Sequence, residues 1–276
     1  MIVIRTAEEL RAFRPQLQAP VGFVPTMGDL HEGHLSLVRR AIRENSSAIA
    51  SIYINPIQFE KHDDLAGYPR TWKKDKDLLA NLAISAVFLP EDAVMYPEGF
   101  STKVTAGKLA SRWEGEYRPG HFDGVCTIVA KLLSLVQPDV AYFGDKDYQQ
   151  LKVIQAMVRD LNIPVTVSSG DIIREPDGLA LSSRNHRLPD EDRIRAPRLK
   201  AALDRVRSGL LAGGESPSIL QSEREALESD GFIVDYLAAV DSESLEPVIS
   251  LHESNEVRLL VAARLSSVRL IDNRAL

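Results

Sequence analysis

Short apolar runs alternate with longer amphipathic segments through the first two-thirds of the chain. The run at 21–24, ended by Pro25, is followed by Leu35, Val38 and Ile42, which have the spacing of one helix face. Further strand-like runs occupy 48–54, 86–89, 140–143 and 165–167, and helical patterns occupy 71–82, 124–136 and 151–161. Strands that alternate with helices form parallel sheets. The pattern predicts a Rossmann-like, doubly wound α/β domain over residues 1–185.

The character of the sequence changes after Asn185. A charged helix is expected from 188 past Leu203 to the Gly213-Gly214 break, followed by a second helix near 218–227. Strand-like runs then occupy 232–240, 257–263 and 268–271. Residues 186–276 are therefore predicted to form a smaller α+β domain.

Polar segments follow several of the predicted parallel strands, at 26–34, 55–58, 144–150 and 174–185. The carboxyl ends of parallel strands share one edge of the sheet, where ligands bind. In the first segment His31 and His34 flank Gly33 at a strand-to-helix junction. Backbone N–H groups at a helix N-terminus hold phosphate, so this edge predicts a nucleotide-handling enzyme. By contrast, the charges of the 71–82 helix, including Asp75, are typical of a solvated face.

The amino-acid composition further narrows the class of protein. The chain has 276 residues, 44% of them apolar, which is enough for a buried core. A net charge of −6 provides no overall positive field for nucleic acid or anionic lipid, and no run reaches the length of a membrane span. We expect a cytoplasmic protein that binds neither nucleic acid nor membrane. The single cysteine, Cys126, is surrounded by apolar residues and is interpreted as part of the core.

Two other interpretations of the motifs fit less well. A zinc-protease helix requires His-Glu-x-x-His, and His31-Glu32-Gly33-His34 is one residue too short. A metal pair at this spacing is possible, but no cysteine cluster or third histidine lies nearby in the sequence. Lys108 is followed by Leu109, where a P-loop would need Ser or Thr for magnesium. Phosphate contact is the favoured role of the histidines, and no dedicated metal site is predicted.

Six segments together carry a family resemblance. The segment 26–34, Thr-Met-Gly-Asp-Leu-His-Glu-Gly-His, resembles the His-x-Gly-His motif of the nucleotidyltransferase superfamily, which includes class I aminoacyl-tRNA synthetases. With 53–59 (YINPIQF), 68–71 (YPRT), 118–122 (RPGHF), 144–150 (GDKDYQQ) and 174–185 (REPDGLALSSRN), the chain is similar to the pantoate–β-alanine ligase family over nearly its whole length.

The resemblance implies a reaction in two steps. ATP and pantoate would give an enzyme-bound pantoyl adenylate and pyrophosphate, and the β-alanine amine would then displace AMP to form pantothenate. Magnesium would accompany ATP, with most of its ligands from phosphates and water. The family resemblance also implies a homodimer.

The resemblance assigns roles to particular residues. His34, His31, Lys146, Ser182 and Arg184 would act on the phosphates during catalysis. The ATP site would comprise Met27, Gly28, Asp29, Leu30, His31, Glu32, Gly33, His34, Gly144, Asp145, Lys146, Asp147, Ile173, Leu181, Ser182, Ser183 and Arg184. Gln58, Gln150 and Asn55 would bind pantoate, and Arg118 and His121 either cover the substrate or serve only the loop that contains them.

Some alternatives remain. Lys146 and Asp147 also fit a surface ion pair. His62, His186 and His252 are given no function. Leu181 stands where the family often has Met, and Asp145 stands where Glu is common; both changes conserve chemistry. Two rival functions are a nucleotidyltransferase that retains the nucleotide in its product and a non-catalytic nucleotide-binding module; the product nucleotide, or the lack of turnover, would distinguish them.

Overall fold

The structure is a computed structural model that describes residues 1–59, 65–250 and 256–276. These residues form two compact units. Unit 1 comprises Met1–Asp145 and Gln150–Asp171, and unit 2 comprises Lys146–Gln149 and Ile172–Leu276. Within the described ranges, no helix is long and apolar enough to cross a membrane.

Unit 1 is built on a six-stranded sheet in which every pairing is parallel. Its strands are β1 (Ile2–Ile4), β2 (Val21–Thr26), β3 (Ser47–Ile52), β4 (Ala86–Phe88), β5 (Val140–Gly144) and β6 (Thr166–Gly170). The spatial order is β1-β4-β3-β2-β5-β6. The chain thus proceeds from β2 to β4 in one direction and resumes on the other side of β2 with β5. The boundary between β2 and β5 is the topological switch point, where ligands bind in such sheets.

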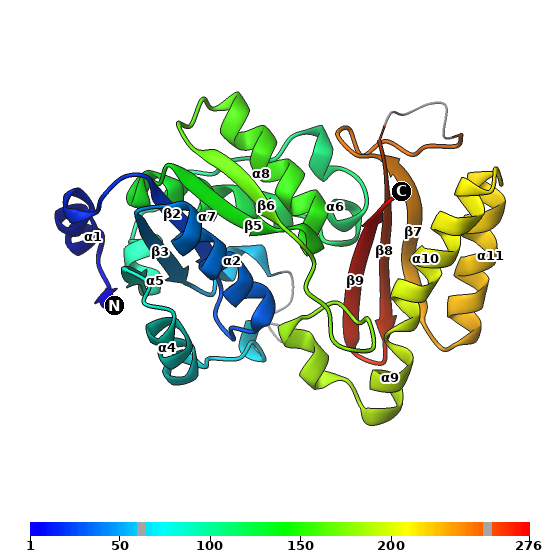
Figure 1. Ribbon diagram of the computed structural model, residues 1–276. Helices are drawn as coiled ribbons and strands as arrows, with labels where there is room; N and C mark the ends of the chain where they lie inside the picture. The colour runs from blue at the N-terminus through cyan, green and yellow to red at the C-terminus, as the bar shows by residue number, and fades with distance from the viewer. Residues whose placement is uncertain (60–64, 251–255) are drawn as a thin grey trace. The chain divides into compact units, whose positions relative to one another are not determined.

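Helices cover both faces of this sheet (Figure 1). They are α1 (Ala7–Phe13), α2 (Glu32–Glu44), α4 (Trp72–Asn81), α5 (Asp92–Met95), α6 (Glu114–Tyr117), α7 (His121–Val136) and α8 (Tyr148–Asp160). Phe23 packs in one core cluster with residues of α1, α7 and α8, whereas Val24 packs in another with residues of α2 and α4. Successive strand residues point to opposite faces, so two apolar layers follow from one strand. The predicted doubly wound α/β fold is confirmed.

Several boundaries differ from the sequence prediction. Pro25 does not end its strand, because β2 continues through Thr26, whose hydroxyl donates to the Ser51 carbonyl. Helix α7 begins at His121 rather than at 124. The short edge strand β1 and helix α1 lie in a segment where no element was predicted; α1 begins with a capping box between Thr6 and Glu9.

In its described residues, unit 2 contains a three-stranded antiparallel sheet and three α-helices. The strands are β7 (Ile233–Asp241), β8 (Val257–Leu265) and β9 (Val268–Ala275), in the order β7-β8-β9, and the helices are α9 (Asp190–Arg195), α10 (Arg198–Leu211) and α11 (Ser216–Ser229). Leu199, Leu203 and Val206 of α10 share one core with residues of the sheet. The single charged helix predicted from 188 was wrong: it is divided at Ala196-Pro197, since proline lacks the N–H that a continuous helix requires.

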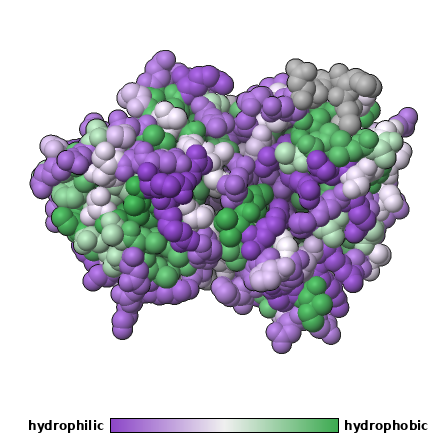
Figure 2. All heavy atoms as spheres, viewed as in Figure 1, coloured by the Kyte–Doolittle hydropathy of each residue, from purple (hydrophilic) through white to green (hydrophobic). Residues whose placement is uncertain are grey.

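The last of the three crossings between the units falls between Asp171 and Ile172, whereas the change in sequence character predicts a domain boundary after Asn185. The segment between these positions groups with unit 2, in which Arg174 donates to Asp272. On the face drawn in Figure 2, hydrophilic residues predominate and hydrophobic areas are interspersed among them. A mixed surface of this kind is normal for a globular chain.

Candidate active site

The loop after β2 contains the first predicted segment. Gly28 has a φ of +87° and Asp29 a φ of +48°, so the chain turns sharply between the strand and α2. Glycine suits the first position for two reasons: the left-handed conformation costs it nothing, and an added Cβ would come within 3.2 Å of Asp75 and of Ile52. The turn brings His31 to the start of α2, beside the switch point of the sheet.

His31 and His34 cap α2 reciprocally. His31 is the N-cap residue, and its Nδ1 accepts a hydrogen bond of 3.2 Å from the Gly33 N–H. The Nδ1 of His34 in turn accepts from the His31 N–H at 3.4 Å. The two ring centroids are 4.2 Å apart. A nitrogen that accepts carries no proton, so these bonds assign the neutral tautomer with its proton on Nε2 to both rings. Both histidines therefore have an N–H donor on the ring nitrogen that does not cap the helix.

A buried carboxylate fixes the same loop. Asp75 of α4 is 0% exposed and accepts hydrogen bonds from the N–H groups of Asp29 at 3.0 Å and Leu30 at 2.9 Å. The Thr71 hydroxyl donates to it as well, at 3.0 Å. The prediction that Asp75 belongs to a solvated face was wrong, because its partners come from a distant segment that local charge alternation does not reveal. The N–H groups of Asp29 and Leu30 are therefore already hydrogen-bonded within the protein. The imidazoles of His31 and His34 are better placed than these N–H groups to donate to a phosphate.

A second network surrounds Gln58, at the end of the 3-10 turn η2 (Pro56–Gln58). The Tyr96 hydroxyl donates to Asn55 Oδ1 at 2.6 Å, and Asn55 Nδ2 donates to Gln58 Oε1 at 2.9 Å and to the Gly124 carbonyl at 3.1 Å. Gln58 Nε2 then lies 3.1 Å from the Met27 sulfur. Since the Gly124 carbonyl only accepts, the orientation of both amides is determined, and Gln58 presents an N–H donor beside the first loop.

Arg118 and His121 support the backbone of the same turn. His121 is 6% exposed; its Nδ1 lies 2.9 Å from the Gln58 carbonyl, and its Nε2 lies 3.1 Å from Arg118 Nη1. A carbonyl only accepts and a guanidinium only donates, so the ring is neutral with its proton on Nδ1. Arg118 also forms an ion pair of 3.7 Å with Glu114. The geometry favours the interpretation in which His121 serves the fold of this segment.

Residues after β5 are divided between the two units. Gly144, the last residue of β5, and Asp145 belong to unit 1, as does Gln150, which is half-buried on α8. Because β5 pairs with β2, Gly144 and the His31 loop follow neighbouring strands at the same edge of the sheet. Unit 1 thus brings together Met27, His31, His34, Asn55, Gln58 and Gly144 on adjoining segments.

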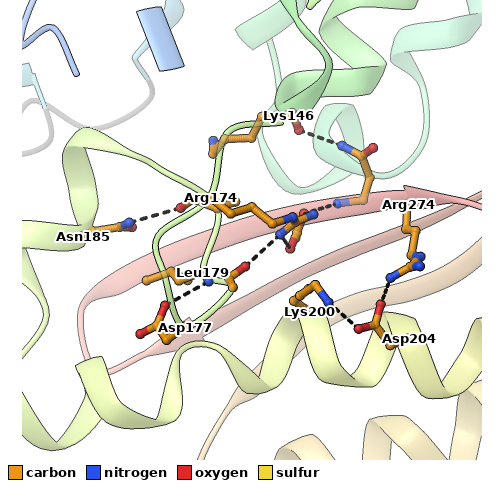
Figure 3. Close-up of polar contacts among 12 residues, drawn as sticks. Lys146, Arg174, Asp177, Leu179, Asn185, Lys200, Asp204 and Arg274 are labelled. Carbon is orange, nitrogen blue, oxygen red and sulfur yellow. Dashed lines mark hydrogen bonds and ion pairs between the residues drawn. The ribbon is translucent and has the colours of Figure 1, made fainter. Parts of the chain in front are cut away.

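Lys146 and Asp147 lie in unit 2. Their side chains form an ion pair of 3.5 Å, in which the Lys146 side chain is 20% exposed and the Asp147 side chain 47%. A pair this exposed contributes little to stability. A phosphate can therefore compete with Asp147 for the ammonium group of Lys146. The backbone carbonyl of Lys146 accepts a hydrogen bond of 2.9 Å from Asn273 Nδ2, drawn in Figure 3.

The segment 172–185, also in unit 2, folds as a short hairpin. Arg174 and Ala180 form an antiparallel bridge, and the Leu181 N–H donates to the Ile173 carbonyl at 2.9 Å. Ile173 and Leu181, both predicted to belong to the ATP site, are therefore neighbours. Ser182 then caps the 3-10 turn η5 (Ser183–Arg187), its hydroxyl accepting from the Arg184 N–H at 3.2 Å. Ser183 and Asn185 are buried, and Asn185 Nδ2 donates to the Ala180 carbonyl.

Three histidines were given no function in the prediction. His186 is exposed, and His62 and His252 lie outside the described residues. Among the residues that the structure describes, no group of three His, Cys, Asp or Glu side chains is placed to hold a metal ion. Sequence reasoning missed four residues that hold these segments: Asp75, Tyr96, Asp272 and Asn273. Each is bonded to residues distant in sequence, so no local pattern revealed its role.

The sheet order, with a histidine-capped helix at its switch point, defines a Rossmann-like α/β protein of the nucleotide-handling kind. A family model described as pantoate-beta-alanine ligase matches residues 2–275. The chain belongs to this family.

Known relatives agree over almost the full length. The chain is 48% identical to the pantothenate synthetase of Cereibacter sphaeroides, covering 98% of each sequence. Its structure is similar to the crystal structure of pantothenate synthetase from Thermus thermophilus, with a TM-score of 0.93, 48% identity and 99% of both chains covered. It is also similar to pantoate-beta-alanine ligase from Francisella tularensis, solved in complex with Beta-gamma ATP and Beta-alanine, with a TM-score of 0.84, 33% identity and coverage of 100% and 97%.

Proposed function

We propose that the protein is a pantothenate-forming ligase, which joins pantoate to β-alanine with conversion of ATP to AMP and pyrophosphate. The observation that carries this proposal is the family match over residues 2–275, together with the Francisella relative that was solved with an ATP compound and β-alanine. The reaction has a clear chemical logic. A carboxylate is a poor acyl donor, and adenylation gives it AMP as a leaving group that the β-alanine amine can displace.

In the adenylation step, the carboxylate of pantoate attacks the α-phosphate of ATP and pyrophosphate leaves. His34 and His31 donate from Nε2 to phosphate oxygens, where negative charge accumulates in the transition state. Their capping bonds through Nδ1 hold this tautomer before substrate arrives, which supports the role. Lys146 and Arg184 add positive charge, Ser182 and Ser183 add polar groups, and Asp147 binds the ribose.

The acyl substrates are held by amide donors. Gln58 presents Nε2 as a donor, which suits the hydroxyl and carboxylate oxygens of pantoate, and Asn55 holds it in that orientation. Gln150 contributes a second amide. Met27, Gly28, Asp29, Leu30, Glu32, Gly33, Gly144, Asp145, Ile173 and Leu181 complete the proposed ATP site. His121 supports the backbone of Gln58 on the substrate side, and Arg118 supports His121.

Other features of the proposal come from the family rather than from a contact. Magnesium would accompany ATP, with most of its ligands from the phosphates and from water, and would neutralise charge on the phosphates. The working form is a homodimer, and the location is the cytoplasm.

The proposal is tested by incubating the purified protein with magnesium, ATP and pantoate, with and without β-alanine. Mass spectrometry should detect AMP, pyrophosphate and pantothenate when all substrates are present, and the pantoyl adenylate when β-alanine is omitted. ATP binding without any AMP would contradict it. A product that retains the nucleotide would instead indicate a nucleotidyltransferase.

A further inference from the structure

Two consecutive polar residues occur in the last strand of unit 2. Asp272 is 5% exposed and Asn273 is 2% exposed, although both lie within β9. Successive side chains of a strand point to opposite faces, so this pair reaches both sides of the sheet. Buried polar groups are costly unless they are hydrogen-bonded, and each of these two is bound to a segment that contains proposed ATP-site residues.

Asn273 holds the segment that contains Lys146. Its Nδ2 donates to the Lys146 carbonyl at 2.9 Å, and its Oδ1 accepts from Arg258 Nε at 2.8 Å. The Arg258 guanidinium lies over the Tyr148 ring, 4.2 Å from its centroid, and the Tyr148 hydroxyl donates to the Ser242 carbonyl at 2.9 Å. Residues Lys146–Gln149 are thus attached to the sheet of unit 2 by several contacts, which explains why they group with it.

Asp272 holds the hairpin that leads to Ser182 and Arg184. Arg174 donates to both carboxylate oxygens of Asp272, at 2.6 Å and 2.9 Å, and also donates to the Gly178 carbonyl at 3.0 Å within its own hairpin. The bidentate pair is directional, and the Asp272 side chain is only 3% exposed. Figure 3 draws the contacts of Arg174 and of the Lys146 carbonyl together.

We infer that Asp272 and Asn273 are positioning residues, which keep the Lys146 turn and the Ser182–Arg184 loop in a fixed spatial relation through strand β9. The inference rests on the proposed function, because both segments are assigned there to the ATP phosphates. Neither residue contacts the reacting atoms. They act by restricting where an ammonium group and a guanidinium group can meet the phosphates, and misplacement of such groups by 1 Å costs up to about a hundredfold in rate.

Asn273→Asp separates this role from simple packing. The carboxylate has nearly the shape of the amide and still accepts from Arg258, but it cannot donate to the Lys146 carbonyl. We expect roughly ten- to hundredfold slower single-turnover release of pyrophosphate. Attack of β-alanine on preformed adenylate should be slowed much less, because two of the three phosphates have already left and only the α-phosphate remains. A merely structural role would lower both half-reactions with the folded fraction.

A double-mutant cycle gives a second readout. If Asn273 acts through Lys146, Asn273→Asp should have no further effect on adenylation in a Lys146→Ala background. A wild-type rate for Asn273→Asp, or an effect that is equally large in both backgrounds, would overturn the inference.

A matched pair of variants tests Asp272. Asp272→Asn weakens the bidentate pair with Arg174. Asp204→Asn makes the same chemical change in α10, at an ion pair with Arg274, which lies two residues after Asp272 in β9. Asp272→Asn should slow adenylation about tenfold or more, and Asp204→Asn should leave it unchanged. Equal rates for the two variants would refute the assignment of Asp272.

Hydrogen exchange tests the anchor without catalysis. Asn273→Asp should increase amide exchange in a peptide covering 144–150 and leave exchange in β2 unchanged. Unaltered exchange there would show that Asn273 does not position the turn. If wild-type protein forms no adenylate from pantoate, the proposed function fails, but this measurement still decides whether the anchor exists.

Discussion

Two loops contribute proposed phosphate contacts, and they are held in opposite ways. In unit 1 a carboxylate, Asp75, collects two backbone N–H groups from the loop before α2, across 46 and 45 residues of sequence. In unit 2 an amide, Asn273, donates to one backbone carbonyl across 127 residues. The first arrangement commits the N–H groups of Asp29 and Leu30 to the protein, and the proposed phosphate contacts come from imidazole rings. In the second arrangement the hydrogen bond holds only the backbone of Lys146, and the proposed phosphate contact comes from its cationic side chain.

The largest effect is expected from the histidines of unit 1. His34→Ala should slow adenylation about a hundredfold or more, the usual loss when one donor to a developing charge is removed. Single-turnover pyrophosphate release measures this step, and His186→Ala, at an exposed histidine, is the control. An unchanged rate in His34→Ala would indicate that the cations of unit 2, rather than the histidines of unit 1, stabilise the phosphates.

The anchor of the first loop should mainly affect stability. Asp75→Asn replaces one acceptor oxygen with a donor that faces backbone N–H groups, and should lower the free energy of unfolding by about 2–3 kcal/mol. Thr71→Val removes only one hydrogen bond to the same carboxylate and should cost about 1 kcal/mol. Urea unfolding compares them; if the two variants are equally stable, the loop amides do not depend on Asp75.

Disruption of the Gln58 network should have a weaker effect, and the parameter that changes should be the KM for pantoate. Tyr96→Phe removes the donor to Asn55 Oδ1, and loss of one hydrogen bond of about 1 kcal/mol corresponds to roughly a fivefold rise in the KM for pantoate. The kcat and the KM for ATP should change little. Gln150→Ala should likewise raise the KM for pantoate. If instead the KM for ATP rose, these amides would belong to the nucleotide site.

The smallest effect is a pH-dependent one in the core of unit 1. Burial, together with the charge of Asp123, raises the pKa of the Cys126 thiol to about 12. The thiol of the unfolded chain, with a pKa of about 8.5, ionises at lower pH than the folded one. The thiol's contribution to the free energy of unfolding is therefore complete below about pH 8.5 and is lost as the pH rises above it. Between pH 7 and pH 9 wild-type stability should fall by about 0.8 kcal/mol more than that of Cys126→Ala.

A pH-independent difference between the two proteins would show that the folded thiol titrates normally. Because Cys126 is the only cysteine and lies in α7, its alkylation also reports the opening of unit 1 alone. Asp75→Asn should accelerate labelling of this thiol, and Asn273→Asp should not.

Sequence patterns predicted the strands that are buried and apolar, and missed those with little pattern. β3 is buried at every position, and its apolar run was recognised, whereas β1 has three residues, one of them exposed, and was not. The break at Pro197 had a signal, but the charged, helix-favouring residues on both sides of it outweighed the proline. Local periodicity therefore determined fold class well and element ends poorly.

The residues proposed for the site divide in the same way. His31, His34, Lys146 and Arg184 lie within motifs that are contiguous in sequence, so a family resemblance names them as candidates. Asp75 and Asn273 were missed because their importance depends on backbone groups far away in the chain, and the sequence around each is ordinary. Lysines next to Asp75 gave the impression of a solvated helix, although its carboxylate is 0% exposed.

The membership of Lys146–Gln149 in unit 2 also has a practical meaning for protein engineering. The chain passes from one unit to the other three times, so no single cut separates them: a fragment ending at Asp171 would retain these four residues without the strand that anchors them. A chimaera is less constrained. Asn273 binds a main-chain carbonyl, which every amino acid provides, so a C-terminal half from a relative would recognise the recipient's turn whichever residue occupied position 146.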